Sequence, residues 1–158
     1  IDLIITNYVK ENYPLKVEQY HTKIKQLKLD KLSKFSNVIY LENNLMWQDD
    51  KDTVDLKLTS LESKIYCKKL NLATKNDWRL PTYDELLHLV DYFRYKPAVI
   101  DEIEYITTNR YWTITEDTTD ISASWYIDFK YGETGTTLRY LKYNVRCVRD
   151  LSKDEGEL

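Results

Sequence analysis

The apolar residues of this sequence change their spacing shortly after Pro97, and this change limits the folds open to the chain. Between about 60 and 93 they recur every three or four positions, which places them on one face of a helix. After the change they alternate with polar residues, which is typical of half-buried strands. The strands predicted from this alternation span 111–115, 124–129, 137–141 and 144–148, with a turn at YGETG between the second and the third. Helices followed by a run of strands predict an α+β fold.

Two helices are predicted before the change, and each begins at a capping box. Thr59 with Glu62 and Thr82 with Glu85 have the S/T-x-x-E spacing, in which the two side chains bond the free backbone amides at a helix start. We expect the first helix to run from about 60 to 72. The residues expected to form the buried faces are Leu61, Ile65, Leu70 and Leu72 in the first helix and Leu86, Leu87, Val90 and Phe93 in the second.

The chain divides into three predicted parts. Residues 1–36 form a helical extension, which either packs on the flank of the domain or joins copies of the chain as an oligomer. Residues 37–150 form the domain, which begins with a strand, a turn and a strand in NVIYLENNLMWQ. Residues 151–158 are an acidic tail. The apolar stripe of the extension consists of Val17, Tyr20, Ile24 and Leu27.

The composition argues against binding to nucleic acid and against a membrane-spanning segment. The 23 basic and 26 acidic residues are mixed along the chain, without the basic block that would neutralise nucleic-acid phosphates. No apolar run approaches the ~20 residues that span a bilayer. Tyrosine is unusually frequent, with 14 residues, and much of the aromatic content lies between 105 and 143, where it favours sheet.

The segment DDKDTVD places four carboxylates close together after a predicted strand. They belong to Asp49, Asp50, Asp52 and Asp55. Carboxylate oxygens are the ligands that Ca²⁺ prefers, but the D-x-D-x-D-G order of a calcium-binding loop is missing. We therefore expect a solvated charged turn and no bound metal.

The two cysteines, Cys67 and Cys147, lie 80 positions apart. This spacing excludes a C-x-x-C redox pair and a zinc knuckle. It leaves two interpretations. One is a disulfide, which would stabilise the fold by on the order of 4 kcal/mol in the chain-entropy model. The other is a pair of unrelated buried thiols.

The motif DWRLPT at 77–82 has a functional and a structural interpretation. A Trp, an Arg and an Asp together could hold a sugar or a carboxylate. In the structural interpretation, which we favour, Pro81 leads into the helix that Thr82 caps and Trp78 lies in the core. Asp77 and Arg79 then bond the backbone or each other.

Six segments together resemble one protein family. They are LMWQDD at 45–50, YCKKLNL at 66–72, DWRLPTYDELLHLVDY at 77–92, YWTIT at 111–115, WYIDF at 125–129 and VRCVRD at 145–150. In this order, from about 37 to 150, they resemble the bacterial C-terminal domain family of the Lcl collagen-like adhesin. The resemblance implies a C-type-lectin-like fold, with two central helices on a twisted antiparallel sheet, related to the formylglycine-generating enzymes. It also implies a Cys67–Cys147 disulfide in a periplasmic, cell-surface or extracellular protein.

The sequence favours a non-enzymatic module that binds a protein or glycan ligand, and no cofactor is expected. Neither His21 nor His88 stands near a Ser or Cys in a nucleophile motif. The EPN-like and WND triplets of sugar-binding C-type lectins are missing, so calcium-dependent sugar binding is not expected. Two alternatives stay open. One is an enzyme of the formylglycine-generating type, which would need free thiols, and the other is a structural or oligomerisation domain that works through residues 1–36.

The binding face is predicted on the outward side of the strands between about 105 and 143. Strand alternation places Trp125, Ile127 and Phe129 on one side of SWYIDF, and we expect this apolar side to face the core. Tyr and Arg on the other side are typical of recognition surfaces. The predicted ligand-binding residues are Tyr126, Asp128, Lys130, Tyr131, Glu133 and Arg139. The alternative is that the tyrosines only cover the sheet.

Overall fold

The computed structural model describes residues 37–41 and 44–151. The predicted extension at 1–36, with the oligomer it would form, lies outside these residues, and so does the acidic tail from residue 152 onwards. The described part of the chain contains three helices and eight strands. The helices are α3 (Asp52–Asp55), α4 (Ser60–Lys69) and α5 (Tyr83–Leu87).

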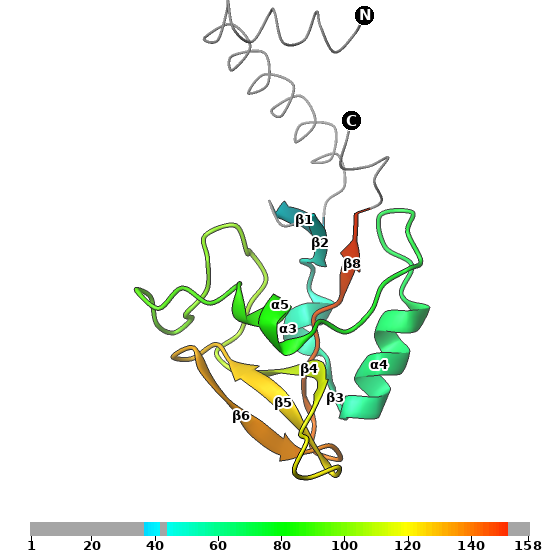
Figure 1. Cartoon of the computed structure of the whole chain (residues 1–158). Coiled ribbons are helices and arrows are strands. Elements are labelled where there is room, and N and C mark those ends of the chain that lie inside the picture. The colour runs from blue at the N-terminus through cyan, green and yellow to red at the C-terminus, as the bar shows by residue number, and fades with distance from the viewer. Residues whose placement is uncertain (1–36, 42–43, 152–158) are drawn as a thin grey trace, which may run out of the picture. The chain divides into compact units, whose positions relative to one another are not determined.

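The strands form two sheets, a small one of three strands and a large one of five (Figure 1). In spatial order the small sheet consists of β1 (Val38–Leu41), β2 (Leu45–Gln48) and β8 (Val148–Asp150). The large sheet consists of β3 (Lys57–Leu58), β7 (Tyr143–Asn144), β4 (Arg110–Glu116), β5 (Ala123–Asp128) and β6 (Glu133–Leu138). Within the described residues, β4 and β7 are the one pair of neighbouring strands that runs parallel, and the other pairs are antiparallel. This arrangement is compatible with the predicted α+β class, while the C-type-lectin-like fold remains a prediction.

Helices α4 and α5 pack on opposite faces of the large sheet. Tyr111 and Trp112 are neighbours in β4, so their side chains point to opposite faces. Tyr111 belongs to the apolar cluster that contains Leu86 of α5, whereas Trp112 belongs to the cluster that contains Cys67 of α4. Each face of the sheet therefore has its own core. Beyond α4, the β5–β6 part of the Trp112 face is only half-buried.

The buried face of α4 differs from the prediction. The capping box at Thr59 and Glu62 is confirmed, but Leu61 and Ile65 are 66% and 44% exposed. The residues that face the sheet are Ser60, Ser63 and Cys67. Small side chains let the helix backbone approach the sheet closely, and the position of Cys67 fixes which face points inward. Apolar spacing alone could not identify a buried face made of serine and cysteine.

Helix α5 begins at its predicted capping box, with Thr82 and Glu85, but ends early, at Leu87. Leu86 is fully buried, as predicted, and Leu87 and Val90 are partly buried. Phe93 was also predicted to be buried, and this prediction is wrong, because its side chain is fully exposed beyond the end of the helix.

The β5–β6 hairpin turns earlier than predicted. Its turn occupies residues 129–132, and β6 starts at Glu133, so YGETG lies partly within the strand. Gly132 in the turn has a φ of +76°, which glycine adopts without steric cost. Gly135 lies opposite Tyr126, and a Cβ at this position would stand 2.8 Å from the Tyr126 hydroxyl oxygen. The second glycine therefore makes room for a ring and does not form a turn.

The predicted strand at 144–148 is divided between the two sheets, and the acidic loop is partly buried. Residues 145–147 connect β7 to β8 and carry Arg146 into the interior, where its guanidinium donates to the Asp49 carboxylate over 2.9 Å. Both side chains are almost fully buried. The prediction of a solvated turn is therefore wrong for Asp49. The following aspartates, Asp52 and Asp55, are exposed in α3.

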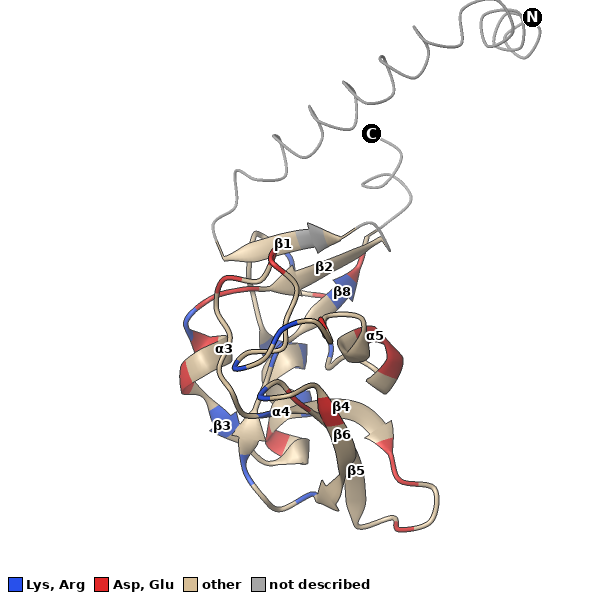
Figure 2. Cartoon of the chain, turned by 90° about the vertical axis from the view of Figure 1, so that its left-hand side faces the viewer, with Lys and Arg blue, Asp and Glu red and all other residues tan. Residues whose placement is uncertain are grey.

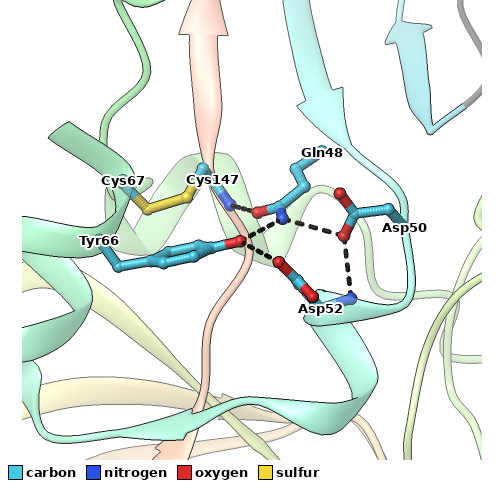
Figure 3. The surroundings of a disulfide bond; sticks show 6 residues. All are labelled: Gln48, Asp50, Asp52, Tyr66, Cys67 and Cys147. Atoms are coloured by element: carbon cyan, nitrogen blue, oxygen red, sulfur yellow. Dashed lines mark hydrogen bonds between the residues drawn. A yellow bond between two sulfur atoms is a disulfide. The ribbon is translucent and has the colours of Figure 1, made fainter. Parts of the chain in front are cut away.

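The Cys67–Cys147 disulfide is confirmed, with a sulfur–sulfur distance of 2.06 Å. Polar groups surround it (Figure 3). The Gln48 side chain accepts from the Cys147 amide over 3.2 Å and donates to the Tyr66 hydroxyl over 2.8 Å. That hydroxyl donates to the Asp52 carboxylate, and its burial raises the pKa of Tyr66. The bond and its polar network thus join α4, β2 and α3.

Loss of this disulfide is expected to lower the free energy of unfolding by about 4 kcal/mol, because it releases a loop of 80 residues in the unfolded chain. Chemical unfolding of the Cys67→Ser, Cys147→Ser double variant beside the parent measures the difference. The intact mass of the parent should lie below that of its reduced form by the mass of the two thiol hydrogens. Two cysteines that react with a thiol reagent in the native parent would contradict this expectation.

Candidate functional site

A stack of side chains stands on the half-buried part of the large sheet. Gly135 in β6 leaves space for the Tyr126 ring of β5. The Arg110 guanidinium of β4 lies over that ring at 4.4 Å from its centre and over the Tyr143 ring at 5.5 Å. The Tyr143 ring in turn contacts the buried Trp112 ring, with 5.0 Å between centres. The stack therefore connects the buried Trp112 ring with the partly exposed Arg110 side chain.

Hydrogen bonds and one carboxylate fix the direction of the Arg110 guanidinium. Its Nη1 donates to the Tyr143 hydroxyl over 3.1 Å, and its Nε is 3.6 Å from the Asp128 carboxylate. Burial opposes the charge of Arg110, but the hydrogen bond to Tyr143, the electrostatic effects of Tyr126 and Tyr143 and the negative Asp128 together more than offset this effect. The pKa of Arg110 is therefore raised above its ordinary value. The guanidinium is a fixed, charged hydrogen-bond donor at the surface.

A hollow of about 240 Å³ opens beside this guanidinium. Strand pairing builds it, because β7 lies between β3 and β4 in the large sheet. Its walls are polar apart from the Tyr143 ring and the side-chain stems, so the hollow suits a polar or charged group. The lining residues are Lys57, Thr108, Asn109, Arg110, Asp128, Lys142, Tyr143 and Asn144. Figure 2 shows both signs of charge mixed over the coloured part of the chain, with a basic position in β3.

The structure brings two of the six predicted binding residues to this site. Tyr126 is part of the stack and Asp128 lines the hollow, and both are half-buried. Glu133 is paired with Asp128 across the β5–β6 ladder and is exposed. The opposite side of β5 faces the core as predicted at Ile127, which is fully buried, as is Phe129 just after the strand. Trp125 on that side is half-buried against the Tyr83 ring.

The other three predicted residues are not among those that line the hollow. Lys130 and Tyr131 occupy the β5–β6 turn, where the Lys130 ammonium is 5.3 Å from the centre of the Tyr131 ring. Arg139 follows β6 at the other end of the hairpin and pairs with Glu116 over 3.1 Å. Of the six predicted residues, Asp128 alone lines the hollow, and its carboxylate accepts from the Lys130 backbone amide over 2.9 Å.

Sequence reasoning missed the three cationic residues of the hollow, Lys57, Arg110 and Lys142. One signal was available for Arg110, which precedes YWTIT and therefore pairs with Asp128 once β4 and β5 are aligned as a hairpin. No signal was available for the two lysines. Lys57 comes from a two-residue strand, and its neighbour across the sheet is Asn144.

The DWRLPT motif has a structural role. Trp78 is buried, which confirms its predicted place in the core. Asp77 and Arg79 were predicted to bond the backbone or each other. The Arg79 guanidinium instead donates two hydrogen bonds of 2.8 Å to the Glu85 carboxylate, and the Asp77 carboxylate accepts from Arg149. The bonds from Arg79 lower the pKa of Glu85. The charged groups of the motif are thus bound within the fold.

Other kinds of site find no support within residues 37–41 and 44–151. No group of three or more His, Cys, Asp or Glu side chains there could hold a metal ion. No helix among these residues has the length and apolar character needed to cross a membrane. Of the two histidines, His21 lies outside the described residues, and His88 is exposed at the end of α5.

No curated protein gives a significant match to the chain. The model of one family, the Lcl C-terminal domain, matches residues 37–149. This match covers most of the chain and includes every residue of the stack and of the hollow. It agrees with the resemblance of the six segments. The chain therefore belongs to the Lcl C-terminal domain family.

Proposed function

We propose that the chain is a non-enzymatic recognition module, which binds a protein or glycan ligand outside the cytoplasm. The observation that carries the proposal is the fixed Arg110 guanidinium beside a polar hollow on the half-buried part of the large sheet. A rigid Arg next to tyrosines is typical of the residues that dominate binding energy at interfaces. The adhesin-like character of the family agrees with such a role.

The cysteines support a binding role over the formylglycine-generating alternative. That chemistry would need free thiols, whereas Cys67 and Cys147 are bonded to each other and are fully buried. A disulfide is also favoured in the periplasm, at the cell surface and outside the cell, where the surroundings are oxidising. Both observations fit a binding module in one of these compartments.

The test is binding of the purified full chain to glycan and protein arrays, followed by titration of the strongest ligand. Arg110→Ala is expected to weaken this binding by about 1–2 kcal/mol, because the variant removes the charged donor at the site. Arg94→Ala is the matched control, since Arg94 is also an exposed Arg with one carboxylate partner, Asp101. We expect Arg94→Ala to bind like the parent.

Two outcomes would contradict the proposal. No ligand on either array would argue against a recognition role for this domain. A ligand whose affinity is the same for Arg110→Ala and the parent would show that recognition uses another face of the molecule.

A further inference from the structure

The hollow beside Arg110 carries more positive than negative charge. Lys57, Arg110 and Lys142 line it, and Asp128 is the one carboxylate among its lining residues. Lys57 and Lys142 are exposed, and within the described part of the chain neither forms an ion pair. Two of the three cations therefore have no carboxylate within ion-pair distance in this part of the molecule, and Lys142 acts on the exposed Glu62 carboxylate only at longer range, where it adds to the hydrogen bonds from Thr59 that lower the pKa of Glu62.

Arg110 itself keeps hydrogen-bonding capacity toward the hollow. Its Nη1 is bonded to Tyr143 and its Nε faces Asp128, whereas its Nη2 makes no hydrogen bond to the described residues. The side chain is 41% exposed. Tyr126 and Tyr143 hold the plane of the Arg110 guanidinium in place. Ligand binding therefore does not cost the entropy of ordering this side chain, and such preorganisation favours binding.

We propose that the hollow binds an oxyanion, which is the carboxylate, sulfate or phosphate group of a larger ligand. The inference rests on the proposed function and names the chemistry of its ligand. Guanidinium and ammonium groups form charge-assisted hydrogen bonds with such oxygens. The volume of about 240 Å³ accommodates one charged group and the atoms next to it. The rest of the ligand then lies outside the hollow, over the sheet.

Gly135 is a positioning residue for this site. A Cβ at Gly135 would stand 2.8 Å from the Tyr126 hydroxyl oxygen and 3.1 Å from Cζ, so Gly135→Ala displaces the ring beneath the guanidinium. The variant changes no charge and no group that lines the hollow. We expect weaker oxyanion binding with the pattern of anion preference unchanged, because the donors are still present but are less well held.

The experiment is an NMR titration of the full chain with acetate, methyl sulfate and methyl phosphate, one at a time, at constant ionic strength set with sodium chloride. We expect saturable shifts of the backbone amides of Thr108, Asn109 and Asn144, and the anion with the lowest Kd identifies the group. Lys57→Ala and Lys142→Ala should each raise that Kd about fivefold, the effect of one unit charge roughly 4 Å away in water. Lys69→Ala, which removes an exposed lysine of α4 outside the hollow, should leave the Kd unchanged.

The proposal is overturned if none of the three anions shifts these amides saturably, or if Lys69→Ala weakens binding as much as Lys57→Ala and Lys142→Ala do. This result can be told apart from failure of the proposed function. An array ligand that still depends on Arg110 would keep the recognition role without an oxyanion. Saturable oxyanion binding without any array ligand would keep the oxyanion site and remove the support for recognition of a protein or glycan.

Discussion

Arg146→Ala is expected to lower the free energy of unfolding by about 3–5 kcal/mol, because it leaves a buried carboxylate without its cation. Arg146 has no exposed surface and Asp49 almost none. Its guanidinium also donates to the backbone carbonyls of Gln48 and Tyr105 and to the Thr53 hydroxyl. The same side chain thus joins β2, the start of α3 and the segment before β4, and all of these bonds are lost together.

The measurement is urea unfolding of the variant beside Arg94→Ala, in which an exposed Arg is removed instead. Exposed ion pairs contribute about 0–1 kcal/mol, so the control should stay close to the parent. The double variant Arg146→Ala, Asp49→Ala should be less unstable than the sum of the single changes, since no buried charge is then left alone. Equal stability of Arg146→Ala and Arg94→Ala would mean that the buried pair does not support the fold.

Local signals in the sequence predicted the local structure well. Both capping boxes start a helix where Thr59 and Thr82 indicated, because the bonds involved connect residues three positions apart. The buried face of α4 could not be predicted in this way. Leu61 and Ile65 have helical spacing, but the disulfide and the small serine side chains turn the other face to the sheet. Apolar spacing carries no information about which neighbour a helix will meet.

The candidate site depended on contacts that no local pattern contains. Arg110, Tyr126 and Tyr143 come from three strands, and their stack exists because β4 pairs with both β5 and β7. The parallel pairing of β4 with β7 could not be inferred from alternation, which has the same period in parallel and antiparallel strands. The burial of Asp49 likewise depends on Arg146, which lies 97 positions further along the chain. The disulfide was predictable only because the family resemblance added information about the fold.

Trp78→Ala is expected to lower the free energy of unfolding by about 3–5 kcal/mol, because truncation of a buried aromatic side chain removes apolar contacts and leaves a cavity. The Trp78 side chain is 3% exposed and packs in the same cluster as Leu80 and Trp112. Its indole Nε1 also donates to the carbonyls of Leu72 and Lys75. These two carbonyls accept backbone bonds from each other's residues as well, so the loss of the indole does not leave them unpaired.

Trp78 thus contributes through apolar packing and through the hydrogen bonds of its indole. Trp78→Phe is the variant that separates the two contributions when it is compared with Trp78→Ala. Trp78→Phe keeps a buried six-membered ring and loses the smaller ring of the indole with its hydrogen bonds, so it should cost about 1–2 kcal/mol, less than Trp78→Ala. Urea unfolding of both variants measures the two costs, and binding of an array ligand by the folded fraction should stay as in the parent. If Trp78→Ala kept its stability but lost the ligand, the indole would contact the ligand, and the functional interpretation of DWRLPT would replace the structural one.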